Sequence, residues 1–307
     1  MPAKRPLPFA AGDTATLICV GITIDLLHAR LLEPDVDPAG LSRRDAAAVP
    51  RGRTVVVRFG VSPDIPVPGE LFDLQVEHAW RFGHTDYLRG TVLRCWLDLD
   101  RVGVPPLGLQ HHREWTLAAW LESQGLDEFD LEPAYDAVVL SGTRREVEIE
   151  QVLPDPLSPL ELEEDAIYES IALREMGDSI RCEKILSELT RQDLRCIDAH
   201  AHLGNLYFEG FWGSADLERA RRHYQVGVAI AERTLDPSDV TAKGWLDNRP
   251  YIRVLHGLGL AAWALGDTKE AERLFDKLLM RDPSDGTGAR FLVQAVRDGV
   301  AYEEYDG

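Results

Sequence analysis

Histidines and carboxylates in the first half of the chain are the residues whose types are best suited to chemistry. They are His78, His84, Asp86, His111, His112 and Glu114. Zinc and iron are often held by such sets, and a histidine can act as a general base. The spacing matches no metal-ligand motif, because the adjacent His111 and His112 point to opposite faces of a strand or lie about 100° apart on a helix. His78 continues an apolar stripe typical of a core position, so we predict no metal and no cofactor.

Sequence signatures of other catalytic chemistries are also missing. The chain has no G-x-S-x-G nucleophile motif, no P-loop and no G-x-G-x-x-G fingerprint. Gly257 and Gly259 are the nearest approach to a glycine-rich loop, but they lie inside a predicted helix, where small residues serve packing. We therefore predict no catalytic residues and a non-enzymatic protein.

The strongest pattern is a 34-residue helical repeat that begins at Ile252. Tetratricopeptide repeats place Leu-Gly at positions 7 and 8, a small residue at 20, an aromatic residue at 24 and proline at 32. In this register these positions hold Leu258-Gly259, Ala271, Phe275 and Pro283. Small residues suit the place where two helices cross, and Pro283 cannot continue the second helix. The stretch 252–285 is therefore predicted to be one helix pair.

Two earlier stretches follow the same register. In 197–234, Leu203-Gly204 and Tyr207 occupy positions 7, 8 and 11, and Ala220 and Tyr224 follow after a turn that is longer by four residues. The stretch 163–196 has a less regular pattern, with small residues at positions 8 and 20 and a glycine in the turn. A terminal repeat is expected to be atypical, because one of its faces has no neighbouring repeat.

The part of the chain from about residue 160 to 299 thus resembles the tetratricopeptide and Sel-like helical repeat family. The resemblance implies a right-handed solenoid whose first helices line a concave groove for a protein or peptide. Residues at the family's groove positions would then be the partner-binding residues: Asn205, Phe208, Arg253, His256, Leu260 and Trp263. Asn205 stands where some members hold a peptide carboxylate, but Ala201 replaces the basic residue of that clamp. For Trp263 and Phe208, a core position is the competing interpretation.

The first half of the chain predicts β-structure. Alternating apolar residues indicate strands over Thr14–Asp25, Arg53–Phe59, Glu70–His78, Thr91–Asp100, Ala137–Leu140 and Arg145–Val152. Short helices are predicted over Leu41–Val49 and Arg113–Ser123. This combination is typical of a mainly antiparallel β domain or a partly open barrel, and it resembles no family that we can name.

The expected architecture is therefore α+β with two domains. Its parts are a flexible N-terminus (1–13), a β-rich domain (14–153), a proline-rich linker (154–162), helical repeats with a closing helix (163–299) and an acidic tail (300–307). Within the helical part, the repeats are 163–196, 197–234 and 252–285.

Composition limits the partners. With 33 Lys and Arg against 52 Asp and Glu, the net charge is −19, which disfavours nucleic acid and anionic membrane surfaces. Four scattered cysteines without a C-x-x-C pattern indicate buried, reduced thiols and a cytoplasmic location. We predict an adaptor for a protein or peptide of unknown identity. The alternatives are an enzyme or a metal- or ligand-binding protein with its site in the β-rich domain, and self-assembly into a homo-oligomer.

Overall fold

The computed structural model describes residues 7, 9–23, 26–31, 53–59, 65–127, 131–153, 165–210 and 214–305. The N-terminal region is rich in strands and the C-terminal region is helical, as predicted. The predicted linker 154–162 and the helix Leu41–Val49 lie outside the described residues. The chain divides into two compact units, each built from two separate stretches: Met1–Pro105 with Leu153–Leu203, and Pro106–Val152 with Gly204–Gly307.

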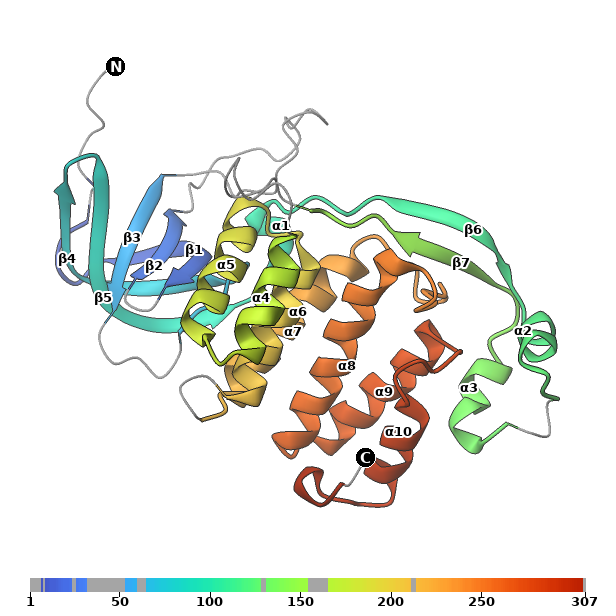
Figure 1. Cartoon of the computed structure of the whole chain (residues 1–307). Coiled ribbons are helices and arrows are strands. Elements are labelled where there is room, and N and C mark those ends of the chain that lie inside the picture. Colours follow the sequence, from blue (N-terminus) through green and yellow to red (C-terminus); the bar gives the residue numbers. More distant parts are fainter. Residues whose placement is uncertain are drawn as a thin grey trace. The chain divides into compact units, whose positions relative to one another are not determined.

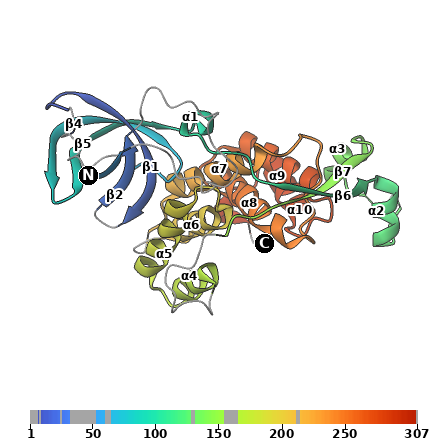
Figure 2. The same cartoon turned by 90° about the horizontal axis from the view of Figure 1, so that it is seen from above.

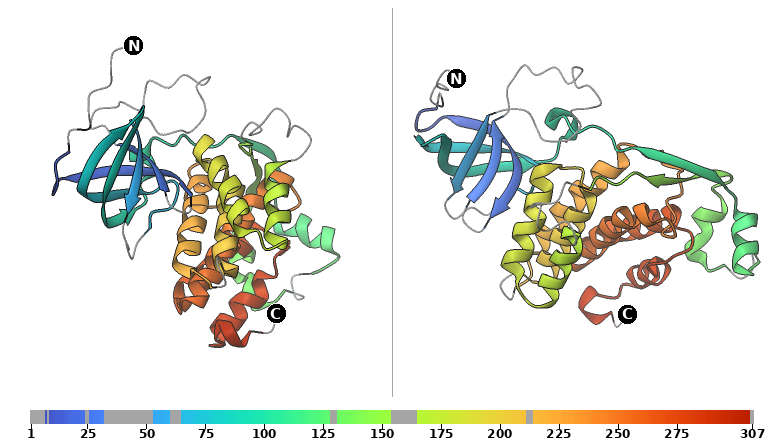
Figure 3. Two further views of the ribbon diagram at one scale, coloured as in Figure 1. Left: turned by 60° about the vertical axis from the view of Figure 1, so that its left-hand side comes forward. Right: turned by 45° about the horizontal axis from the view of Figure 1, so that its top comes forward.

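Five strands of the first unit close into a barrel. They are β1 (Thr14–Thr23), β2 (Leu26–Leu31), β3 (Thr54–Phe59), β4 (Leu71–Phe82) and β5 (Thr85–Trp96). Their order around the barrel is β1-β2-β3-β5-β4, and Figure 3 shows the strands in blue and teal. Neighbouring strands are antiparallel, apart from the parallel pair β3 and β5. The sequence predicted either a mainly antiparallel β domain or a partly open barrel, and the strands form a closed barrel.

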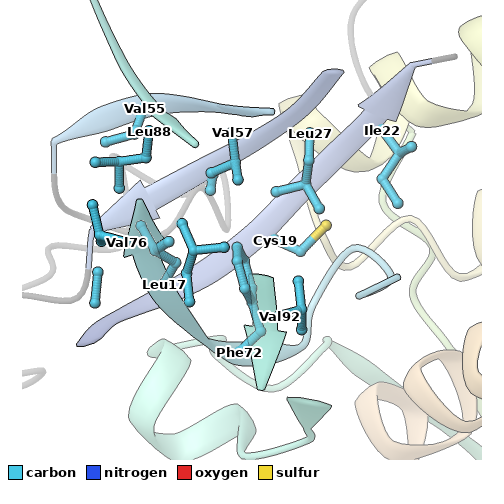
Figure 4. Packing of buried hydrophobic residues seen from close by; sticks show 13 residues of the cluster. Leu17, Cys19, Ile22, Leu27, Val55, Val57, Phe72, Val76, Leu88 and Val92 are labelled. Atoms are coloured by element: carbon cyan, nitrogen blue, oxygen red, sulfur yellow. The ribbon is translucent and has the colours of Figure 1, made fainter. Parts of the chain in front are cut away.

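The core of the barrel follows from alternation along each strand. Because successive side chains point to opposite faces of a sheet, every second residue along a strand points into the barrel. Apolar residues occupy these inward positions. Figure 4 shows these side chains meeting between the strands. The buried set includes Leu17, Cys19, Leu27, Val55, Val57, Phe72, Leu74, Val76, Leu88 and Val92.

Strand β2 was not predicted, and it explains how β1 ends. The apolar stretch expected as one strand over Thr14–Asp25 ends at Thr23, and the chain returns as β2. The register between the two strands shifts between Cys19 and Gly21. The predicted strands Glu70–His78 and Thr91–Asp100 fall in the long antiparallel pair β4 and β5. The second prediction ran too far, because β5 ends at Trp96 and Leu99–Val102 is a short helix.

Four helices are described, in whole or in part, in the first unit. They are α1 (Leu99–Val102), α4 (Ala166–Glu175), α5 (Ser179–Gln192) and the start of α6 (Ile197–Glu209). Helices α4 and α5 pack together, and α5 packs on β1. A Cβ atom on Gly21 would lie 3.3 Å from the carbonyl oxygen of Ser187, so a glycine in β1 lets α5 approach the barrel closely.

The second unit begins with a two-stranded sheet. Strands β6 (Leu109–Trp115) and β7 (Arg144–Ile149) run antiparallel, and Figure 2 shows them side by side. Between them lie α2 (Leu117–Gln124), the 3₁₀ turn η3 (Pro133–Tyr135) and α3 (Asp136–Val139). The predicted strand Ala137–Leu140 is therefore wrong, because these residues form α3 and the turn after it.

The predicted helix Arg113–Ser123 is correct only in its second part. Arg113 to Trp115 belong to β6, and α2 starts at Leu117 after Thr116, whose side-chain oxygen accepts a hydrogen bond from the Ala119 N–H. A threonine before an apolar run is an N-cap signal, because its hydroxyl satisfies a backbone donor that has no partner within the helix. The residues that follow Thr116 therefore become helical, whereas those before it pair with β7.

Strand β7 attaches the two-stranded sheet to the segment 236–248. The Val147 N–H donates to the Val240 carbonyl at 2.9 Å, and the Val240 N–H donates to the Arg145 carbonyl at 2.8 Å. The buried Asn248 amide accepts from the Ile149 N–H and donates to the Val147 carbonyl. These bonds explain why residues 106–152 belong with the C-terminal helices, whereas the sequence analysis placed them in the β-rich domain 14–153.

The C-terminal helices of the second unit are shown in orange and red in Figure 1. After the end of α6 come α7 (Leu217–Glu232), the 3₁₀ turn η4 (Leu246–Asn248), α8 (Arg249–Ala264), α9 (Thr268–Arg281), α10 (Ala289–Arg297) and the 3₁₀ turn η5 (Tyr302–Glu304). Helix α8 packs on both α7 and α9, and α10 packs on α9. The closing helix predicted after the last pair is α10.

Glycines lie where these helices approach one another. A Cβ atom on Gly257 of α8 would lie 2.5 Å from the Tyr224 ring of α7, and the same ring blocks a Cβ atom on Gly204 of α6. A Cβ atom on Gly259 would lie 2.5 Å from the Phe275 ring of α9. The small residues therefore make room for buried aromatic rings at the positions that the spacing predicted.

Candidate partner-binding face

The six predicted partner-binding residues all lie in the second unit, on two helices. Asn205 and Phe208 belong to the last turns of α6, and Arg253, His256, Leu260 and Trp263 follow one side of α8 at spacings of three or four residues. Such spacings place side chains on one face of a helix. Five of the six are half-buried, and only Trp263 is buried, with 2% of its surface exposed. We use the name α6–α8 face for these six residues.

Trp263 is covered by the chain's own segment 300–305. Its indole Nε1–H donates to the Val300 carbonyl oxygen at 3.0 Å. Its ring lies 5.6 Å from the Tyr302 ring and 5.2 Å from the Tyr305 ring, measured between centroids. Phe275 of α9 packs edge-on against the same indole at 6.3 Å. Trp263 therefore joins the helix pair α8 and α9 to the segment after α10.

Phe208 meets the same segment from α6. Its ring lies edge-on to the Tyr302 ring, with the centroids 5.8 Å apart. Tyr302 thus contacts both Phe208 and Trp263, and burial raises the pKa of its hydroxyl, with a further contribution from Glu303. The segment that was predicted as an acidic tail forms the turn η5 against α8.

The polar members of the face are engaged within the unit. The Asn205 side-chain oxygen accepts a hydrogen bond from the Tyr224 hydroxyl at 2.7 Å, so it holds the aromatic ring that fills the space beside Gly204. Burial, together with a smaller effect of the Lys243 charge, lowers the pKa of His256 to about 4. At neutral pH His256 is therefore uncharged, and it acts as a flat, weakly polar surface rather than as a cation.

Two of the residues considered for chemistry, Asp86 and His112, make contacts with different neighbours in different units. Asp86 of β5 binds Arg53 at 2.5 Å and Arg81 at 2.8 Å. Burial acts to raise its pKa, but the hydrogen bonds from both arginines outweigh that effect and the pKa is lowered. In the other unit, the His112 ring stacks on Trp245 with centroids 3.6 Å apart, and its Nε2 lies 2.9 Å from Glu148.

Within the described residues, no group of three or more histidines, cysteines, aspartates or glutamates is placed to hold a metal ion. The cysteines Cys19, Cys182 and Cys196 are buried thiols. Burial raises the pKa of the Cys196 thiol to about 12, which keeps it protonated and unreactive at neutral pH.

A hollow of about 350 Å³ beside β6 and β7 was not predicted. Its walls include Trp115, Trp120 and Trp245, and the ion pair of Arg113 with Glu146 borders it. Trp245 also donates its indole N–H to Glu146 at 2.9 Å. The volume of the hollow is at the lower end of the volumes typical of small-ligand sites. Trp245 comes from the 236–248 segment, so its place in the same hollow as Trp115 depends on the long-range docking of β7 and left no local sequence signal.

Three residues of the segment that covers the α6–α8 face were also missed, namely Val300, Tyr302 and Tyr305. The spacing of the two tyrosines was the available signal, because residues three apart in a tight helical turn lie on the same side. Their partner Trp263 lies 37 residues from Val300, and no repeat pattern specifies a contact from outside the repeat.

Comparison of the sequence with models of protein families finds no match, and comparison with curated proteins finds no relative. Among the described helices, none combines the length and the apolar character that a membrane crossing requires. The interpretation of the α6–α8 face therefore depends on its geometry.

Proposed function

We propose that this protein is a non-enzymatic cytoplasmic adaptor that binds a protein or peptide partner through the α6–α8 face. In this proposal the helices form a tetratricopeptide-like solenoid, with α6 and α8 as the first helices of successive pairs. Gly204, Gly257 and Gly259 lie against aromatic rings of neighbouring helices, which supports this assignment of α6 and α8 as first helices.

The observation that carries the proposal is the segment 300–305 on the face. A short stretch of chain, outside the helix pairs, lies across Phe208 and Trp263 and binds through one backbone carbonyl and two aromatic rings. Tryptophan and tyrosine rings dominate the energetics of many interfaces. The face therefore has the chemistry to hold a peptide.

The test compares two leucines in a binding assay. Proteins captured by the purified chain are identified, expressed and titrated against the chain by calorimetry. Leu260→Glu places a charge on the face and is expected to weaken binding of a true partner at least tenfold, because an apolar contact worth about 1.5–3 kcal/mol is lost.

Leu246→Glu is the matched control, since Leu246 is 64% exposed in η4 and outside the face. Thermal unfolding verifies that both variants are folded. Equal affinity of the two variants for every captured protein would show that binding does not use the α6–α8 face.

A further inference from the structure

The segment 300–305 has the contacts of a bound peptide. It follows α10, forms the single turn η5, and is held by the hydrogen bond from Trp263 Nε1 to the Val300 carbonyl. Tyr302 packs between Phe208 and Trp263, and Tyr305 packs on Trp263. The bond to Val300 involves only its backbone, so the side chains that specify the contact are the two tyrosines.

The two residues between Tyr302 and Tyr305 are acidic. Glu303 and Glu304 are exposed, and the turn directs them away from the two rings. The contact therefore selects for two aromatic side chains three residues apart and for a free backbone carbonyl ahead of them. It tolerates acidic residues between the rings, because these face solvent.

The covering segment is held by few contacts. On the face it has one hydrogen bond, to the Trp263 indole, and a set of ring contacts of two half-buried tyrosines. Its Val300 N–H also donates to the Ala295 carbonyl at the end of α10. Segments with few buried contacts open at low cost compared with global unfolding. A ligand presenting the same groups can therefore compete for Trp263 without unfolding the helices.

We propose that residues 300–305 are an internal ligand that closes the α6–α8 face, and that the partner is a peptide with two aromatic residues three apart that displaces it. This inference rests on the proposed adaptor function and specifies its partner chemistry. The covalent link gives the internal segment an effective concentration on the order of millimolar. A free peptide at micromolar concentration competes poorly until that segment is removed from the face.

The probe is a fluorescein-labelled peptide with the sequence of residues 298–307, titrated against the full chain by fluorescence anisotropy. The variant Tyr302→Ala with Tyr305→Ala removes both rings of the internal segment. We expect the apparent Kd for the labelled peptide to be at least tenfold lower for this variant than for the wild type. A peptide with both tyrosines changed to alanine should bind neither protein.

Two matched variants control for folding and for charge. Tyr302→Phe with Tyr305→Phe keeps the rings and is expected to exclude the peptide as the wild type does, and so is Glu303→Ala with Glu304→Ala. Circular dichroism verifies the helix content of each variant. Equal affinity of the wild type and the double alanine variant, or no binding by the folded double alanine variant, would overturn the proposal.

A segment supplied by a second copy is a separate outcome. In that case light scattering would show a dimeric wild type and a monomeric double alanine variant, and the internal arrangement would be overturned. The two proposals also fail separately. If the double alanine variant binds the labelled peptide but no partner depends on Leu260, the adaptor function fails alone. If a Leu260-dependent partner binds the wild type and the double alanine variant equally well, the internal-ligand proposal fails alone.

Discussion

Asn248 offers the sharpest test of how strand β7 is attached to the second unit. Its side chain is fully buried and makes three hydrogen bonds to backbone groups. It accepts from the Ile149 N–H at 3.0 Å and donates to the carbonyls of Val147 at 2.8 Å and Ala242 at 3.3 Å. Asn248→Ala leaves all three backbone groups without these bonds in a buried place.

The expected loss follows from these contacts. A hydrogen bond contributes about 1 kcal/mol net, and a buried group left without a partner costs about 1–3 kcal/mol. Three bonds, one of them long, give a loss of roughly 3 kcal/mol in the free energy of unfolding for Asn248→Ala. Asn248→Asp should lose at least as much, because the carboxylate keeps the acceptor but faces two carbonyl oxygens.

The assay is urea unfolding followed by tryptophan fluorescence, combined with hydrogen exchange at the Ile149 amide. Gln151→Ala is the matched control, because Gln151 makes a single exposed hydrogen bond, to the Asp247 carbonyl, and its loss should cost less than about 1 kcal/mol. The reasoning is refuted if Asn248→Ala costs no more than Gln151→Ala, or if the Ile149 amide stays equally protected from exchange.

Two further outcomes are expected. Gly257→Ala should destabilise the chain by roughly 2 kcal/mol, since the clash with the Tyr224 ring costs about 3 kcal/mol and the better helix propensity of alanine returns about 1 kcal/mol. The control is Gly244→Ala, where a Cβ atom meets nothing within 4 Å. This control should be neutral in the same urea titration. Burial lowers the pKa of His200 to about 4, so the unfolded chain binds more protons below pH 6.5 and stability is lost as the pH falls from about 6.5 towards 4. Between pH 6.5 and 5, the free energy of unfolding of His200→Gln should fall by roughly 2 kcal/mol less than that of the wild type. Parallel plots of unfolding free energy against pH for the two proteins would contradict this.

Residues with a local physical role were predictable. Leu258-Gly259 and Phe275 specify a helix crossing through spacing alone, because glycine on one helix leaves room for an aromatic ring on the next, and Gly259 does lie against Phe275. Thr116 is a helix cap that the sequence contains, although the predicted helix began at Arg113, four residues before α2 starts at Leu117.

Residues whose role depends on distant chain segments were not predictable. The run Ala137–Leu140 is apolar and β-branched in part, which favours a strand, but it follows the turn η3 and becomes helical. Asn248 carries no pattern that connects it with Ile149, which is 99 residues away. Of the candidate face, the resemblance to the repeat family implied Phe208 and Trp263 as groove residues, whereas their contact with Tyr302 came only from the structure.

Each of the two units is built from two separate stretches of the chain, and this has a consequence for synthesis on the ribosome. Strand β7 needs Val240 and Asn248 as hydrogen-bond partners, and both are translated almost a hundred residues later. Domains generally fold as they emerge, at about 5–20 residues per second, so the nascent β6–β7 pair waits several seconds with its outer edge unpaired. A growing chain that stalls before residue 240 would therefore expose that strand edge to other polypeptides.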